Sequence, residues 1–373
     1  MKVLHILNEI TFSGAEVMLR VAAPTFAANS LESHILSTGD NIGNYADILK
    51  EAGYIVHHIP FSKSPEYFCN VFSLIRHEKF NVVHIHPERA FFWHTMVTWA
   101  SGVQRIFRTV HDVFLFSGYL KIKRKYQRLL ARKLFGLIFI SIGTSVKKIE
   151  KEYYNNLTIV IKNWIDEEYF TPPTNTEKIQ AKRALGFRDG DIVIITVGTC
   201  NQKKDHYAVF NALSQINLSL QTPLKYLHRG TGPTRDDERK YSESIGVSSS
   251  TLFVDFINDV RSAYWASDIF VMTSGWEGLG NVILEAMYCG LPVILYNVLG
   301  MRDTLPEGVG GMLVEPDPTN LARAIKKLVL NPELRTQMGM DAYESVKRNF
   351  KTENSLEKLI GLYKGEKVRN LQC

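Results

Sequence analysis

Cysteine is scarce in the 373-residue chain, and no two cysteines stand close together. No C-x-x-C spacing occurs among Cys69, Cys200, Cys289 and Cys373. We therefore expect reduced thiols, with neither a disulfide framework nor a zinc site. Long apolar runs are also lacking, since no stretch approaches the roughly 20 apolar residues that a membrane-spanning helix needs.

The stretch "MKVLHILNEI" at the amino terminus lacks the features of a signal peptide. His5, Asn8 and Glu9 interrupt its short apolar run, and no small-residue cleavage site follows. We expect a buried first strand there instead. Together with the missing membrane span, this favours a cytoplasmic protein.

The composition argues against a disordered chain. Apolar residues make up 45% and charged residues 22%, as in a folded globular protein. The length suits two domains. No short-period repeat or low-complexity tract occurs, so a folded enzyme is the starting expectation.

The net charge of +6 is unevenly distributed. The segment "KIKRKYQRLLARK", from Lys121 to Lys133, carries seven Lys and Arg and no acid, interleaved with apolar residues such as Ile122 and Tyr126. One interpretation is a solvated helix face. The other is a patch that meets a polyanion, either an anionic membrane surface or a phosphorylated acceptor. We expect no nucleic-acid partner.

Short runs rich in Val and Ile alternate with helical patterns along the chain. The first group of expected strands covers residues 3–7, 34–37, 55–59, 82–86, 106–110, 137–141 and 159–162. A polar stretch with two prolines, "TPPTNTEK" at 171–178, predicts a linker. The second group covers residues 192–197, 224–227, 252–254, 269–273, 293–296 and 312–314.

Continuous apolar strands separated by helices indicate parallel sheets covered on both faces. The sequence therefore predicts an α/β fold with two doubly wound, Rossmann-like domains that face a cleft. We expect domains at 1–170 and 171–350, and a helix within 351–373 that packs back on the first domain. Ligands bind outside the carboxyl ends of strands in such sheets.

Three strand-end turns carry residues suited to a phosphate. "SGAE" places Gly14 where a loop gives way to a helix near residue 15, and the amino end of a helix attracts anions. In "VGTCNQKKDH", Lys204 stands at the start of a helix, and in "LHRGTG", Arg229 precedes a G-x-G turn. An ordinary helix cap and solvated surface side chains are the alternatives. None of these turns is G-x-G-x-x-G, which argues against NAD.

The stretch "SGWEGLGNVILEAMYCGLPVIL" carries the strongest signal. Glu277 precedes a Gly-x-Gly turn, and Glu285 is expected about two turns into the following helix. A nucleoside diphosphate could lie across this turn, with one acid reaching a sugar and the other a ribose. Each charge-assisted hydrogen bond to a hydroxyl would contribute roughly 1.5–3 kcal/mol. The alternative is two exposed acids beside a capped helix.

His111, in "RTVHDVF", directly follows an apolar strand and should lie at the cleft edge. A lone histidine is more often structural than functional. The stretch "NWIDEEYF" could likewise be functional or structural, because it could simply turn the chain into the linker.

Together these stretches resemble glycosyltransferase family 4, whose members are retaining nucleotide-sugar enzymes of the GT-B fold. "SGAE" resembles the family's Gly-Gly-Ala-Glu loop, and "VVHIH" and "TVHD" resemble its two histidine strands. "NWIDEEYF" is similar to the crossover, and "VGTCNQKKDH" to the phosphate loop. "WEGLGNVILEAMYCGLPVI" matches the signature in which two glutamates stand eight positions apart, and it is the most specific match.

The resemblance implies roles for four residues, which are Lys204, Gly14, His111 and Glu285. Lys204 would bind the donor diphosphate and neutralise the departing nucleotide without a metal ion. Gly14 would approach the diphosphate from the first domain, and His111 would hydrogen-bond the donor sugar. Glu285 would accept hydrogen bonds from the ribose hydroxyls.

The resemblance also implies how the sugar and base are held. Glu277 would bind the transferred sugar, and the base would lie near Phe256 and Ile257. The backbone amides beside the sugar would be those of Gly278, Leu279, Gly280 and Asn281. Retention would pass through an oxocarbenium-like transition state, with attack on the face from which the leaving group departs. No protein nucleophile is evident, and His111, Lys204 and Glu277 are the expected catalytic residues.

Three positions depart from the family pattern. Thr199 replaces the arginine of the phosphate loop, and we expect Arg229 to compensate in part. Asp303, in "LGMRD", replaces a glutamate, and Ser13 replaces the first glycine of the Gly-Gly-Ala-Glu loop. These departures bear on donor affinity and identity more than on the fold.

The sequence thus predicts a cytoplasmic, metal-independent hexosyltransferase without a cofactor. It would move a sugar from a UDP- or GDP-sugar to a saccharide or lipid-linked saccharide in polysaccharide biosynthesis. The segment from Lys121 to Lys133 would dock on the inner face of the membrane. The alternatives are a GT-B epimerase or phosphorylase, or a degenerate transferase that serves as a partner subunit.

Overall fold

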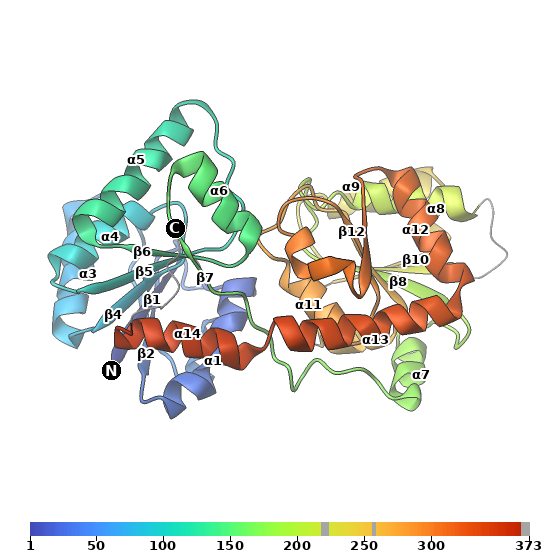
Figure 1. Ribbon diagram of the computed structural model, residues 1–373, viewed down its shortest axis with the longest axis horizontal. Helices are drawn as coiled ribbons and strands as arrows, with labels where there is room; N and C mark the ends of the chain where they lie inside the picture. The colour runs from blue at the N-terminus through green and yellow to red at the C-terminus, as the bar shows by residue number, and fades with distance from the viewer. Residues whose placement is uncertain (218–223, 256–258, 367–373) are drawn as a thin grey trace. The chain divides into compact units, whose positions relative to one another are not determined.

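The computed structural model describes residues 1–217, 224–255 and 259–366, which form two compact units (Figure 1). The first unit comprises Met1–Ile165 with Thr352–Cys373, and the second comprises Asp166–Lys351. The chain therefore passes from one unit to the other twice. The polar stretch 171–178 lies inside the second unit, where Thr174 and Glu177 form a capping box at the start of a helix.

The first unit is built on a parallel sheet of seven strands in the order β3-β2-β1-β4-β5-β6-β7. The strands are β1 (Lys2–Leu7), β2 (Glu32–Ser37), β3 (Ile55–His58), β4 (Val82–Ile85), β5 (Arg105–Val110), β6 (Ile138–Ser141) and β7 (Ile159–Val160). The order reverses between β1 and β4, which pair in parallel. Ligands of doubly wound sheets bind beyond the carboxyl ends of strands at such a reversal.

Seven helices belong to the described part of the first unit. They are α1 (Gly14–Ala28), α2 (Ala46–Glu51), α3 (Pro65–Glu78), α4 (Phe91–Ala100), α5 (Gly118–Phe135), α6 (Thr144–Tyr154) and α14 (Thr352–Lys364). Helix α14 lies beside α1 (Figure 1) and buries Leu356, Leu359, Ile360 and Tyr363 in the core of this unit. A helix that ends the chain thus completes the core that β1 begins.

The second unit has a parallel sheet of six strands in the order β10-β9-β8-β11-β12-β13. The strands are β8 (Ile192–Val197), β9 (Leu224–Arg229), β10 (Thr251–Val254), β11 (Ile269–Met272), β12 (Val293–Tyr296) and β13 (Gly311–Val314). Its helices are α7 (Asn175–Ala184), α8 (His206–Asn217), α9 (Arg235–Ser244), α10 (Val260–Trp265), α11 (Asn281–Tyr288), α12 (Pro318–Leu330) and α13 (Pro332–Asn349). Here the order reverses between β8 and β11, so the loops after these strands mark the expected ligand site.

Both sheets confirm the predicted doubly wound α/β fold. All thirteen expected strands are present, most of them within one or two residues of the expected bounds. The expectation held because a strand covered on both faces is a continuous apolar run: β12, with the sequence VILY, is buried at every position.

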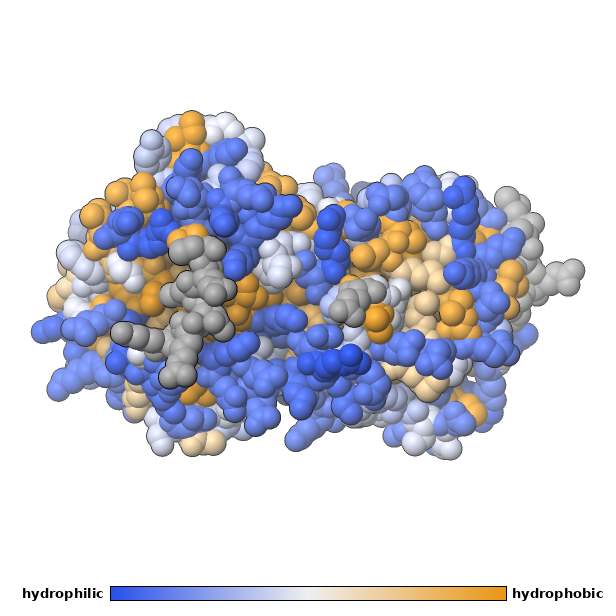
Figure 2. Space-filling model, in the orientation of Figure 1, coloured by the Kyte–Doolittle hydropathy of each residue, from blue (hydrophilic) through white to orange (hydrophobic). Residues whose placement is uncertain are grey.

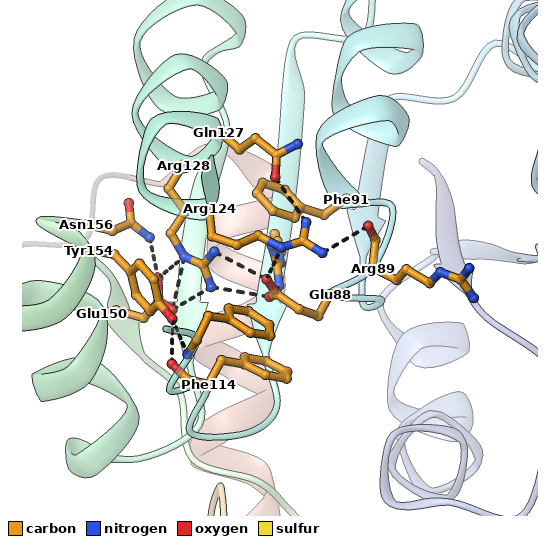
Figure 3. Close-up of polar contacts among 12 residues, drawn as sticks. Glu88, Arg89, Phe91, Phe114, Arg124, Gln127, Arg128, Glu150, Tyr154 and Asn156 are labelled. Atoms are coloured by element: carbon orange, nitrogen blue, oxygen red, sulfur yellow. Dashed lines mark hydrogen bonds and ion pairs between the residues drawn. The ribbon is translucent and has the colours of Figure 1, made fainter. Parts of the chain in front are cut away.

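Helix α5 carries the basic segment, and buried ion pairs fix it to the first unit (Figure 3). Nε of Arg128 donates to Oε2 of Glu150 at 2.8 Å, and its Nη2 lies 3.2 Å from Glu88. Arg108, on β5, also contacts Glu88, and Nε of Arg124 lies 3.5 Å from the same carboxylate. Two of the seven basic residues, Arg124 and Arg128, thus face inward and are not part of a solvated face.

Candidate functional site

The glycine turn after β11 brings its backbone close to a neighbouring turn. Gly280 has a φ of +75° and forms the N-cap of α11, a backbone conformation that favours glycine. The amide of Glu277 donates to the carbonyl of Leu299 at 3.0 Å. A Cβ on Gly300 would lie 1.9 Å from the carbonyl oxygen of Glu277, so only glycine allows this approach. The two turns together hold Glu277 and the amino end of α11 in place.

Lys204 and Glu277 form an ion pair within the second unit. Nζ of Lys204 lies 2.9 Å from Oε1 of Glu277, and Nζ of Lys203 lies 3.5 Å from Oε2. Burial of the carboxyl alone would raise the pKa of Glu277. The two lysines outweigh burial and lower that pKa, so the carboxylate is ionised. The structure therefore joins two of the three residues expected to be catalytic.

Hydrogen bonds and close packing hold the loop that carries Lys204. Lys204 lies in the turn before α8, which begins at His206 and not at the lysine itself. The Thr273 hydroxyl donates to the carbonyl oxygens of Lys204 and Asp205. A Cβ on Gly198 would lie 3.2 Å from Cε of Lys204, so the lysine stem crosses the glycine closely. This packing aims the ammonium at Glu277.

Glu285 is the fifth residue of α11, about one turn into the helix and not two as the sequence predicted. The Tyr264 hydroxyl donates to Oε2 of Glu285 at 2.9 Å. Burial raises the pKa of Glu285 to about 7, although Tyr264 and Arg229 act in the opposite direction. The carboxyl is thus poised to change its charge near neutral pH. Tyr264 was not expected from the sequence, where nothing distinguishes it from other buried tyrosines.

Arg229 ends β9 and is buried, with 2% of its surface exposed. Burial lowers its pKa, while Tyr264, Asp259 and Glu285 raise it. The structure therefore groups Arg229 electrostatically with Glu285 and Tyr264. Thr199 is exposed in the turn after β8.

The remaining residues of the second unit that the sequence assigned to the donor site lie in the glycine turn and after β10. Gly278 and Leu279 are buried, and Asn281 is the first residue of α11. Phe256 and Ile257, which the sequence placed near the base, lie outside the described residues.

A chain of hydrogen-bonded histidines crosses the carboxyl edge of the first unit's sheet. Nε2 of His111 lies 2.9 Å from Nδ1 of His86, and Nε2 of His86 lies 3.2 Å from Nδ1 of His5. Burial lowers the pKa of His111 to about 4 and that of His5 to about 3, and it lowers the pKa of His86 far below its usual value. These rings are therefore neutral at physiological pH.

A cavity of about 20 Å³ opens beside this chain of histidines. Its lining includes His5, His84, His86, His111, Asn163 and Trp164. His111 follows β5 as predicted, and the stretch "VVHIH" marked a second histidine strand that contains His86, but nothing in the sequence indicated that His5, His86 and His111 would be hydrogen-bonded in a row. His86 follows β4 and His5 lies on β1, and the contacts among the three rings became visible only with the strand order.

Gly14 is the exposed first residue of α1, which begins one residue earlier than predicted. The side chain of the N-cap residue, Ser13, makes no hydrogen bond to the helix backbone and instead contacts the carboxylate of Glu16. The Glu16 carboxylate, which also accepts from its own backbone amide, thus occupies part of the amino end of α1. Gly14 and His111 belong to the first unit, and Lys204, Glu277 and Glu285 to the second.

Comparison with known proteins gives a family match for the second unit and several matches for the whole fold. Residues 177–345, within the second unit, match the family model for glycosyl transferases group 1. The chain is therefore similar to this family over most of its second unit. A UDP-Gal:alpha-D-GlcNAc-diphosphoundecaprenol alpha-1,3-galactosyltransferase of Escherichia coli is 25% identical over 319 residues, which cover 83% of this chain and 81% of that protein.

Other proteins align over less of the chain, or by fold alone. The lipopolysaccharide core biosynthesis glycosyltransferase LpsE of Rhizobium meliloti is 31% identical, but the aligned part covers 43% of this chain and 46% of LpsE. Among solved structures, Anabaena HepE in complex with UDP and glucose has a TM-score of 0.85 at 17% identity, covering 98% of this chain and 100% of HepE. WaaG, a glycosyltransferase involved in lipopolysaccharide biosynthesis, has a TM-score of 0.77 at 17% identity, with 97% and 100% covered.

These findings confirm the resemblance to the family, the GT-B fold and the glycosyltransferase activity. The residues expected to carry that activity are tested by none of them. Within the described residues, no helix is both long and apolar enough to cross a membrane.

Proposed function

We propose that this glycosyltransferase moves a hexose from a UDP-sugar to a lipid-linked saccharide, with retention of configuration. The observation that carries the proposal is the Lys204–Glu277 ion pair beside the amino end of α11. Two relatives favour UDP over GDP: the Escherichia coli enzyme is named for UDP-Gal, and HepE was solved with UDP. The former is also named for a diphosphoundecaprenol-linked acceptor.

The proposed donor lies across the glycine turn. The diphosphate takes hydrogen bonds from Lys204 and the amino end of α11, where the helix dipole favours negative charge. Glu285 accepts from the two ribose hydroxyls, and Glu277 accepts from hydroxyls of the transferred sugar. In the first unit, Gly14 supplies backbone amides to the diphosphate and His111 binds the sugar.

The reaction breaks the bond between the anomeric carbon and the diphosphate oxygen, and UDP leaves with the electron pair. Lys204 stabilises the charge that develops on the leaving phosphate, so the step needs no divalent cation. An acceptor hydroxyl attacks the same face of the oxocarbenium-like sugar, and its proton is released as the new glycosidic bond forms. Because Glu277 is paired with a lysine, it serves to orient the sugar and does not act as a nucleophile.

Binding of nucleotides tests the donor assignment. The purified protein is heated with UDP, GDP or ADP, with and without EDTA, alongside Lys204→Ala and Glu285→Gln. UDP at 100 times its dissociation constant should add about 2.7 kcal/mol to stability. We expect stabilisation by UDP in EDTA, reduced in both variants. If no nucleotide stabilises the wild type, the donor site is wrong, and a partner-subunit role becomes the better explanation.

We propose that the exposed side of α5 docks on an anionic membrane at its cytoplasmic face. Large apolar side chains are exposed along this helix, and they are Tyr119, Leu120, Ile122, Tyr126, Leu129, Leu130 and Leu134. Lys123, Lys125 and Lys133 are exposed among them. Figure 2 shows hydrophobic and hydrophilic surface side by side over the region of α5. Such a helix binds a bilayer surface through apolar burial and attraction to acidic headgroups.

Vesicle flotation tests this docking. The protein should float with vesicles containing phosphatidylglycerol and remain unbound with phosphatidylcholine alone. Lys123→Glu with Lys125→Glu should abolish flotation, while Lys147→Glu with Lys148→Glu, on α6, serves as a charge-matched control. Equal flotation with both lipids, or equal loss in both double variants, would contradict docking through α5.

A further inference from the structure

Four potential metal ligands converge in the second unit, away from the ion pair of Lys204. The group consists of Cys200, His206, His228 and Glu238, whose ligand atoms all lie within 4.8 Å of one another. The side chains come from four places in the fold: the turn after β8, the start of α8, the end of β9, and α9. All four residues are buried. Close spacing along the chain, the usual sequence signal of a zinc site, is absent here.

The four ligand atoms already face one another. Nε2 of His228 lies 2.7 Å from Oε2 of Glu238 and 4.0 Å from Sγ of Cys200. Nδ1 of His206 lies 3.2 Å from Oε1 of Glu238. The Thr234 hydroxyl donates to Glu238 at 2.7 Å and so orients the carboxylate. A hydrogen-bonded support of this kind is typical of the residues behind a metal ligand.

The backbone around this group is held tightly. A Cβ on Gly230 would lie 1.8 Å from the carbonyl oxygen of Gly198, and one on Gly232 would lie 2.3 Å from that of Cys200. The amide of Cys200 donates to the carbonyl of Thr231 at 2.9 Å. The turns after β8 and β9 are therefore pressed together, which fixes Cys200 opposite His228.

We propose that Cys200, His206, His228 and Glu238 bind one zinc ion with a structural role. One thiolate, two imidazoles and one carboxylate give the four ligands that zinc takes in closed sites. A divalent ion with one thiolate and one carboxylate is neutral overall, and the guanidinium of Arg235, which contacts Cys200, is itself paired with Asp255 at 3.0 Å. Bond lengths near 2.0 Å separate tetrahedral ligands by about 3.3 Å, so the contact between His228 and Glu238 must widen slightly.

Binding changes the protonation of the group. Zinc is bound by the thiolate form of cysteine and by neutral imidazoles. On binding, the thiol proton passes to solvent, and each imidazole keeps its proton on the nitrogen that faces away from the ion. One proton is therefore released for each zinc ion.

The proposed zinc site lies next to the loop that carries Lys204. Cys200 comes before Lys204 in the same turn, and His206 comes two residues after it. An ion would therefore fasten both ends of the loop that carries this lysine. The consequence for donor binding rests on the proposed function, whereas the ion site itself does not.

Metal binding by the full chain, purified without a histidine tag, tests the proposal. The chain as isolated should contain about one zinc ion after desalting, as in closed structural sites. Apoprotein titrated with Co²⁺ alone should develop a sulfur-to-cobalt charge-transfer band. Cys200→Ser should lose that band, while Cys69→Ser, at an exposed cysteine in the first unit, should keep it.

The same preparations separate this proposal from the proposed function. If neither zinc nor cobalt binds the wild type, or if the band persists in Cys200→Ser, the zinc site is wrong, and the four side chains are a hydrogen-bonded group only. UDP stabilisation is measured on these samples independently. Stabilisation by UDP without metal binding would overturn the zinc site alone, and metal binding without any effect of UDP would overturn the donor site alone.

Discussion

Glu285 combines two properties that oppose each other. Its carboxyl is held in surroundings that raise its pKa to about 7, yet the proposed role requires the ionised form to accept from ribose hydroxyls. When Glu285 ionises in the folded protein, its carboxylate therefore lacks the water that solvates it in the unfolded chain. Nucleotide hydroxyls restore part of what burial removes.

The pH dependence of UDP binding should follow this carboxyl. As pH rises through about 7, Glu285 ionises and UDP affinity should increase. Glu285→Gln should remove the pH dependence and weaken binding about tenfold or more, since hydrogen bonds to charged groups contribute roughly 1.5–3 kcal/mol each. Titration calorimetry from pH 6 to 8.5 measures both effects, with Glu353→Gln as a control in the first unit. An unchanged profile in Glu285→Gln would assign the titration to another group.

Stability without nucleotide should respond with the opposite sign. A carboxyl whose folded pKa is raised favours the folded state below its unfolded pKa, and this contribution is lost as pH rises through the folded value near 7. Glu285→Gln cannot ionise, so it should be more stable than the wild type at pH 8 in the absence of UDP. Urea denaturation of both proteins at pH 5 and pH 8 measures this. If the stability of Glu285→Gln relative to the wild type is lower at pH 8 than at pH 5, the assignment is wrong.

Lys204 and Lys203 form a matched pair for testing the diphosphate site. Both lie near Glu277, but Nζ of Lys204 is at 2.9 Å and that of Lys203 at 3.5 Å. Lys204→Ala should lower kcat and UDP affinity by about tenfold to a hundredfold, the equivalent of one hydrogen bond to a charged group. Lys203→Ala should change both by much less. Equal losses in the two variants would show that general positive charge, and not the placement of Lys204, is what matters.

At the scale of elements, α5 and α6 are joined through charge. Burial alone would lower the pKa of Arg128, but Glu150 and Glu88 raise it above its usual value. Glu150→Ala would leave Arg128 buried with only Glu88 as an acidic partner. We expect a loss of about 3–5 kcal/mol, as for other buried pairs with one partner removed. Urea denaturation measures it, and Glu152→Ala, at an exposed position of α6, should change stability little.

The ends of β1, β4 and β5 act together through the histidine chain. His86 lies between His5 and His111, so it fixes which nitrogen of His111 faces the sugar in the proposed site. His86→Phe should lower kcat at least tenfold while UDP affinity stays unchanged, and His86→Gln should restore part of the activity. His77→Phe, at an exposed position of α3, is the control. A fall in UDP affinity equal to the fall in kcat would indicate a general loss of structure.

The strands could be predicted, and the polar contacts between elements could not. Continuous apolar runs mark buried parallel strands, and the spacing of Glu277 and Glu285 marked the glycine turn after β11. Which basic residues of α5 turn inward could not be predicted, because Arg124 and Arg128 stand in the same basic segment as Lys123 and Lys125 and nothing in the sequence distinguishes them. Such contacts depend on which helix lies beside which.

At the scale of the whole molecule, the first unit depends on a distant part of the chain. Helix α14 buries Leu356, Leu359 and Tyr363 against the core that contains β1. A chain that ends after Lys351 should therefore lose the cooperative unfolding of the first unit, because several large apolar side chains would leave its core. Calorimetry should show this loss, while the second unit still unfolds cooperatively and binds UDP. A truncated chain with both transitions intact would contradict a structural role for α14.

The two crossings of the chain also set an order of synthesis. The second unit is one continuous stretch, Asp166–Lys351, whereas the first is interrupted and needs Thr352–Lys364 to close its core. Domains fold as units during translation once their residues have left the ribosome. The second unit is therefore made in one stretch, while the earlier-made part of the first unit, its histidine chain included, waits for Thr352–Lys364 to be synthesised.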